Sequence, residues 1–203
     1  MTQAVCISHA TGADGAAVGR AVAERLGFRY VDDEVIAEAA EWAELDPALV
    51  ADAERRKPLV ARLLGHMTEG GPAQRMSSGE WARTAPTDAD LRAVITDVLR
   101  SFADKGSVVI VSHAASFALA GGDALRVLVT ASDETRTKRV SESSGTDERD
   151  ASRQVKQEDG ARADYLKRFY GVDRELPIHF DLVLNTDALT PAQAADIIAW
   201  AAT

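Results

Sequence analysis

The chain has 203 residues, 46% of them hydrophobic and 27% charged, which is typical of a globular protein with one domain. Its formal net charge of -9 argues against polymeric nucleic acid or an anionic membrane as a partner, because both bind cationic surfaces. A single cysteine excludes a disulfide framework and a cysteine zinc site, and no apolar run approaches the ~20 residues of a membrane-spanning helix. We therefore expect a cytoplasmic protein, and a small anionic ligand stays compatible with the charge.

Short apolar runs alternate with amphipathic stretches along the chain. In chain order the sequence predicts a strand at 4–7, a helix at 16–26, a weaker strand at 28–31, helices at 33–43, 47–64 and 88–105, strands at 107–111 and 125–130, helices at 134–143 and 151–170, a strand at 181–184 and a helix at 191–202. Thr190 is the expected N-cap of the last helix, with Pro191 at its first position. This alternation predicts one α/β domain over 1–203 with a parallel sheet.

Two polar segments interrupt the alternation. Residues 65–87 are rich in Gly, Ser, Thr and Pro, so we expect a mobile loop or a small insertion there. Residues 143–150 are polar and lie between two expected helices, a position that suits a lid.

The first strand leads into a glycine-bearing loop, "SHATGADGAAVGR", that opens a helix. Backbone N–H groups at a helix N-terminus bind phosphate, and glycines let phosphate oxygens approach the backbone. Gly12, Gly15 and Gly19 are present, but Ala16 and Ala17 follow Gly15 where a P-loop carries lysine and a hydroxyl residue. The loop also lacks the dinucleotide fingerprint. An anion-binding loop and a plain strand-to-helix turn both remain open.

Asp14 lies where a bound anion would sit. Its carboxylate repels a phosphate unless Mg²⁺ or an arginine intervenes. The alternative is a turn residue that tolerates left-handed geometry, or a cap on the following helix.

Several motifs together resemble the cytidylate-kinase-like proteins, which are P-loop relatives of bacterial CMP kinase. The motifs are "SHATGADGAAVGRAVAERLG", "YVDDEVI", "VIVSHAA", "VLVTASDETRTKRV", "QEDGARADYLKRFYGVD" and "FDLVLNTDALTPAQAADII". The resemblance spans nearly the whole chain and is least clear over 44–87, and the C-terminal third matches best.

This resemblance implies a three-layer P-loop kinase fold: about five parallel strands between helices, a helical lid at 143–156 and a monophosphate-binding region at 65–87. It implies transfer of the γ-phosphoryl group of ATP to a nucleoside monophosphate such as CMP, with Mg²⁺, a reaction that needs several cations around the moving group. The implied ATP contacts in the loop are Gly12, Ala13, Asp14, Gly15, Ala16 and Ala17.

The chain departs from the family pattern at cationic positions. His9, Ala16 and His113 stand where the family has arginine, and Asp14 replaces a small loop residue. Histidine is mostly neutral at pH 7 unless a carboxylate or phosphate raises its pKa. The two histidines could still meet a phosphate, an acceptor group or a metal. The alternative is drift at a site that no longer transfers phosphate.

Other arginines survive around the implied lid. Arg136 and Arg139 share a helix face and are candidates to bind ATP. Arg149, Arg153 and Arg162 are the candidate catalytic contacts to phosphate when the lid closes. The alternative is an ordinary solvated helix in which such residues form intrahelical ion pairs.

Asp32 and Asp33 follow the second expected strand. They could orient Mg²⁺ or accept the proton of a substrate hydroxyl. Together with His9 and His113, the two aspartates are the four candidate substrate-binding residues. Asp33 alternatively caps the next helix. The histidine, cysteine and carboxylate spacing predicts no protein-held metal site.

Three functions follow from these residues. The first is a nucleotide-binding kinase acting on a pyrimidine monophosphate, with ATP and Mg²⁺. The second is a degenerate kinase homologue that senses a ligand or binds a partner. The third is a phosphotransferase for another small molecule, with His9 and His113 contacting its acceptor group. The sequence leaves a homo-oligomer open.

Overall fold

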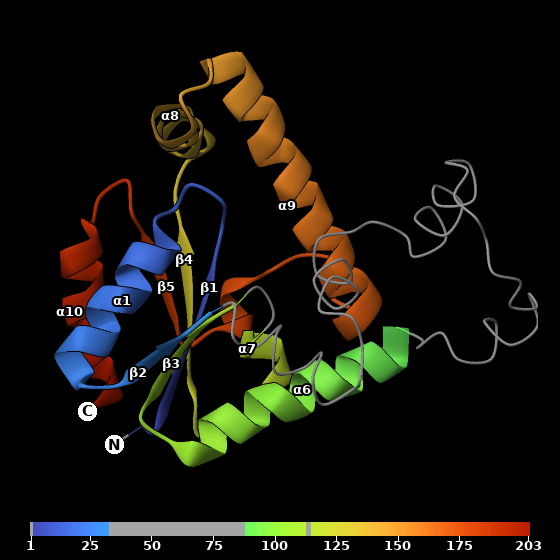
Figure 1. Cartoon of the computed structure of the whole chain (residues 1–203), viewed down its shortest axis with the longest axis vertical. Coiled ribbons are helices and arrows are strands. Elements are labelled where there is room, and N and C mark those ends of the chain that lie inside the picture. Colours follow the sequence, from blue (N-terminus) through green and yellow to red (C-terminus); the bar gives the residue numbers. More distant parts are fainter. Residues whose placement is uncertain (1, 33–87, 113–114) are drawn as a thin grey trace, which may run out of the picture.

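The computed structural model describes residues 2–32, 88–112 and 115–203. The predicted helices at 33–43 and 47–64, the segment 65–87, and the candidate residues Asp33 and His113 lie outside these described ranges. Figure 1 draws the residues outside the described ranges, 1, 33–87 and 113–114, as a grey trace.

Five parallel strands form one sheet in the order β2-β3-β1-β4-β5. Their bounds are β1 Ala4–His9, β2 Arg29–Val31, β3 Val108–Val111, β4 Leu125–Thr130 and β5 Leu182–Asn185. The predicted parallel sheet is therefore confirmed. The third strand begins one residue later than predicted, because Ser107 has a left-handed φ of 52° that a strand does not accommodate.

Helices cover both faces of this sheet (Figure 1). Their bounds are α1 Gly15–Leu26, α6 Asp88–Lys105, α7 Ala115–Ala118, α8 Asp133–Ser144, α9 Glu148–Tyr170 and α10 Pro191–Ala202, with a 3₁₀ turn at Pro177–His179. Alternating side chains of β1 divide the core: Val5 and Ile7 pack toward α1 and α10, and Ala4 and Cys6 pack toward α6, α7 and α9. This is the predicted three-layer arrangement.

Side-chain caps fix the first residues of α9 and α10. Thr190 accepts from the Gln193 amide with Pro191 at the first position, as predicted. The Asp147 side chain accepts from the Asp150 amide, so α9 begins at Glu148 and not at residue 151. The polar segment is thereby reduced to a short turn that joins α8 to α9, and Figure 1 shows α8 nearly end-on beside the start of α9.

The carboxyl ends of the parallel strands lie at one edge of the sheet, which is where α/β proteins bind ligands. The β1–α1 loop leaves this edge after His9, and the loop after β5 joins it through a bond from the Thr186 amide to the Thr130 carbonyl, 2.8 Å long. In the described part of the chain, no helix has the length and apolar character to cross a membrane.

Candidate functional site

The loop between β1 and α1 is built on two left-handed residues, Gly12 (φ 78°) and Asp14 (φ 59°). A Cβ atom at Gly12 would lie 2.6 Å from the backbone oxygen of Arg136, closer than real contacts allow. Only glycine therefore lets the loop reach this position against α8 without strain. The Ala13 amide closes the turn on the Ala10 carbonyl at 3.0 Å.

Asp14 occupies the N-cap position of α1, but its side chain makes no capping hydrogen bond. Its carboxylate instead faces Arg139, with 3.2 Å between Asp14 Oδ2 and Arg139 Nε. The first N–H groups of an α-helix have no intrahelical acceptor. The Asp14 side chain therefore does not occupy the amides at the start of α1, from Gly15 to Ala17.

Arg139 is anchored by backbone and hydroxyl groups as well as by Asp14. Its guanidinium donates to the Gly12 carbonyl at 3.3 Å, to Thr186 Oγ1 at 2.9 Å and to the Thr186 carbonyl at 2.8 Å. Thr186 Oγ1 in turn donates to the Ala13 carbonyl at 3.1 Å. The buried Thr186 side chain thus links the end of β5 to the loop by hydrogen bonds. Nothing in the motif "FDLVLNTDALT" indicated this role in the sequence.

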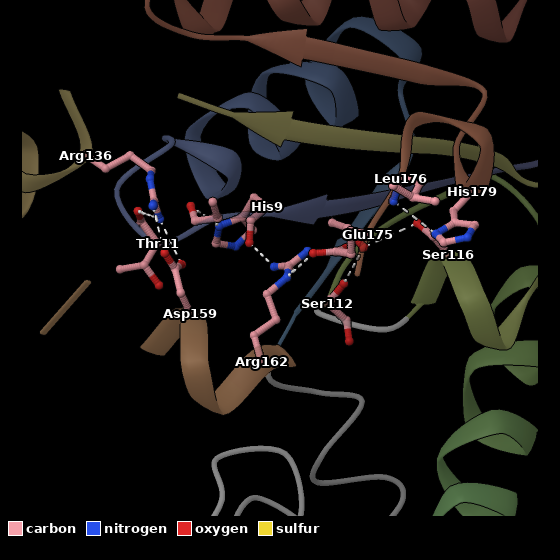
Figure 2. A network of polar contacts seen from close by, with 12 residues as sticks. His9, Thr11, Ser112, Ser116, Arg136, Asp159, Arg162, Glu175, Leu176 and His179 are labelled. Atoms are coloured by element: carbon pink, nitrogen blue, oxygen red, sulfur yellow. Dashed lines mark hydrogen bonds and ion pairs between the residues drawn. The ribbon is translucent and has the colours of Figure 1, made fainter. Parts of the chain in front are cut away.

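Arg136 joins α8, α9 and the loop (Figure 2). Its guanidinium binds both carboxylate oxygens of Asp159, at 2.9 and 2.7 Å, and Asp133 at 2.7 Å. It also donates to the Thr11 carbonyl at 3.3 Å. The hydrogen bonds that it donates to Asp159 raise the pKa of this buried arginine above its ordinary value. Arg136 is therefore a fixed cation directly beside the loop.

Arg162 connects α9 to the end of β1 (Figure 2). It donates to the His9 carbonyl and forms a two-pronged ion pair with Glu175, at 2.6 Å from Nε and 2.8 Å from Nη2. Both side chains are largely buried. Arg162 thus fixes the end of β1, from which the β1–α1 loop starts. Glu175 lies outside the quoted motifs, so the sequence analysis did not single it out.

His9 packs its imidazole against the start of α1, where a Cβ on Gly15 would lie 2.2 Å from His9 Cγ. Burial lowers the pKa of His9 below its usual 6.5, and the Arg162 guanidinium lowers it further. The imidazole is therefore neutral at pH 7 and supplies no positive charge that would replace the family arginine.

Acidification is expected to destabilise the fold through His9. The unfolded chain binds a proton at His9 near pH 6.5, whereas the folded chain binds it only at lower pH. The free energy of unfolding should therefore fall as the pH drops from 6.5 toward the lowered folded pKa, and less steeply in His9→Asn. Urea unfolding of both proteins above and below pH 6.5 measures this difference, and parallel pH profiles would contradict it.

The remaining candidates lie farther from the loop. Arg153 is 71% exposed and pairs with Asp150 one turn earlier on α9. Arg149 lines a cleft of about 530 Å³ between α8 and α9, together with Lys138 and Lys156. Asp32, after β2, lies 3.9 Å from Arg20. Arg136, Arg139, Arg162 and His9 are thus assembled around the loop, while Arg149 and Arg153 belong to the first turns of α9.

The side chains around the β1–α1 loop would hold Mg²⁺ only together with a ligand that supplies some of the oxygen atoms bound to the ion. Within the described ranges, no group of three histidine, cysteine or carboxylate side chains could hold a metal. Mg²⁺ is commonly bound by one or two carboxylates together with substrate phosphates. Asp14, 37% exposed at the head of α1, is one such carboxylate.

Comparison with known proteins identifies this architecture. A sequence profile described as the cytidylate kinase-like family matches residues 4–188. Cytidylate kinase of Methanopyrus kandleri is 26% identical over 132 residues, covering 61% of this chain and 68% of that protein. An S-adenosylmethionine-dependent nucleotide dehydratase of Lacinutrix mariniflava is 34% identical over 76 residues. That match covers 37% of this chain and spans only 16% of the dehydratase.

Two solved structures share the fold at low sequence identity. A protein of Eubacterium ventriosum described as uncharacterised superposes with a TM-score of 0.68 at 19% identity, covering 98% of this chain and 97% of its own. Shikimate kinase from Bacteroides thetaiotaomicron gives 0.51 at 14% identity, with the same coverage. The fold is therefore that of P-loop kinases, and the chain belongs to the cytidylate kinase-like family.

Proposed function

We propose that this protein binds ATP at the β1–α1 loop and transfers its γ-phosphoryl group to a nucleoside monophosphate, with a pyrimidine monophosphate as the first candidate. Membership of the cytidylate kinase-like family supports the reaction class. One structural observation supports ATP binding at this loop in particular: the Asp14 side chain does not cap the amides at the start of α1. They are the groups on which a P-loop holds phosphate.

Each group around the loop has a role in this proposal. The amides of Gly15 to Ala17 hold phosphate oxygens, and Arg139, fixed beside Gly12, supplies positive charge that its partner Asp14 offsets in the absence of ligand. Arg149 and Arg153, carried by the first turns of α9, approach the phosphates when α8 and α9 close over them. Mg²⁺ bound to the triphosphate would neutralise charge that develops in the transition state. In the transfer, the bond from the γ-phosphorus to the bridging oxygen breaks as the acceptor oxygen bonds to that phosphorus.

The test is formation of ADP and CDP from ATP, MgCl₂ and CMP, followed by chromatography of both products. Arg153→Ala is expected to reduce the rate at least about tenfold, since it removes one charge from the transition state. Lys167→Ala is the matched control: it removes an exposed cation from the same helix, one that pairs with Asp173, and should leave the rate unchanged. Absence of turnover with every monophosphate tried would remove the kinase proposal.

A degenerate kinase that binds nucleotide without transferring phosphate is the second candidate. The observation that favours it is that, among the residues that the structure describes, little free positive charge lies near the loop. Arg136 and Arg162 form ion pairs with carboxylates, and His9 is neutral. The same experiment separates the two functions, because calorimetric binding of MgATP without product formation supports the second. A phosphotransferase for another acceptor would instead show ADP formation with a small molecule outside the nucleotides, found by thermal-shift screening.

A further inference from the structure

Asp14 is the one residue of the loop whose chemistry opposes the ligand that the loop geometry favours. It adopts a left-handed φ of 59°, a conformation in which glycine is unstrained and aspartate is tolerated. Its side chain does not cap α1. The structure therefore confirms Asp14 as a turn residue in left-handed geometry and not as a side-chain cap, and the position of its carboxylate is the feature left to interpret.

That carboxylate neutralises a cation that is held in place without it. Asp14 Oδ2 lies 3.2 Å from Arg139 Nε, while Gly12 and Thr186 anchor the other guanidinium nitrogens. Loss of the Asp14 charge would leave Arg139 in position with its full positive charge at the mouth of the loop. Asp14 therefore sets the net charge that an incoming ligand meets.

A metal-free triphosphate meets no net positive charge from the Asp14–Arg139 pair. The carboxylate cancels the attraction of the guanidinium and repels any phosphate that approaches it more closely than Arg139 does. A divalent cation carried by the triphosphate reverses the sign of the interaction, since Mg²⁺ accepts a carboxylate oxygen alongside phosphate oxygens. The described part of the chain has no three-residue metal site, so the cation would arrive with the nucleotide.

Resting on the nucleotide binding proposed above, we propose that Asp14 makes binding of a nucleoside triphosphate at this loop depend on a divalent cation. In the absence of ligand the carboxylate stays on Arg139. It disfavours the metal-free triphosphate and contacts the cation of the metal–nucleotide complex. Asp14 is thereby a specificity-determining residue for the metal complex over the free nucleotide.

Isothermal titration of ATP into the full chain, in excess MgCl₂ or in EDTA, tests this inference. The wild-type protein is expected to bind ATP at least tenfold more tightly with MgCl₂, a difference of about 1.4 kcal/mol. Asp14→Asn is expected to bind metal-free ATP at least tenfold more tightly than wild type and to lose most of its dependence on MgCl₂. Asparagine tolerates the left-handed conformation, so the loop geometry is kept, and Asp14→Gly is the second variant.

Asp196→Asn is the matched control, because it removes one carboxylate from the Arg25–Asp196 pair between α1 and α10. It should retain the wild-type ratio between the two titrations. Equal binding with and without MgCl₂, unchanged in Asp14→Asn, would overturn the inference and leave nucleotide binding standing. No binding by wild type, Asp14→Asn or Asp14→Gly under either condition would overturn the proposed function and this inference together. Tight binding of MgCl₂ alone would contradict delivery of the cation by the nucleotide.

Discussion

Replacement of Arg162 by alanine is expected to lower the free energy of unfolding by about 3–5 kcal/mol, because it leaves Glu175 largely buried without its guanidinium partner. It also removes the hydrogen bond that holds the His9 carbonyl at the end of β1. Arg162→Lys should recover only part of the loss, since an ammonium group cannot reproduce the two-pronged contact. Urea unfolding measured at neutral pH gives the difference.

Two further variants test the cause of that loss. Arg153→Ala removes an exposed arginine from the same helix and should cost less than about 1 kcal/mol, as for other surface ion pairs. Adding Glu175→Gln to Arg162→Ala removes the unpaired charge and should restore part of the stability. A double variant no more stable than Arg162→Ala would show that the buried carboxylate is not the source of the destabilisation.

Gly12→Ala is expected to weaken MgATP binding at least tenfold, or about 1.4 kcal/mol. The new methyl group would lie 2.6 Å from the Arg136 backbone oxygen, which cannot rotate away. The loop must therefore move away from α8, and the loop amides are displaced together with it. The left-handed conformation costs about 1–2 kcal/mol for alanine, and the crowding adds about 1–3 kcal/mol. Calorimetry with MgATP and urea unfolding measure the two effects.

Gly27→Ala provides the matched control for that variant. Gly27 ends α1 with a φ of 66°, and a Cβ there meets no atom within 4 Å. Its replacement should cost only the conformational penalty and leave MgATP binding unchanged. Equal effects of Gly12→Ala and Gly27→Ala on both measurements would show that close approach to α8 is not required for the ligand.

Local sequence signals determined the framework of this protein. Apolar runs placed all five strands, because a strand buried on both faces needs nearly continuous apolar side chains. Thr190 and Pro191 marked the start of α10, since caps act within one helical turn. Gly12 and Gly15 marked the loop, where the backbone needs a left-handed turn or a close approach. Each of these signals depends on residues only a few positions apart.

The partners of the charged side chains were decided by the tertiary structure alone. Arg162, which the sequence predicts as a contact to phosphate, pairs in the structure with Glu175, thirteen residues later and beyond the end of α9. Arg136 binds Asp159, 23 residues away on the neighbouring helix, and Asp14 meets Arg139 instead of capping its own helix. An ion pair requires its two groups within about 4 Å, and that distance follows from how the helices pack on the sheet. The sequence by itself thus determined which charges the protein carries around the β1–α1 loop, and packing determined which of them neutralise one another.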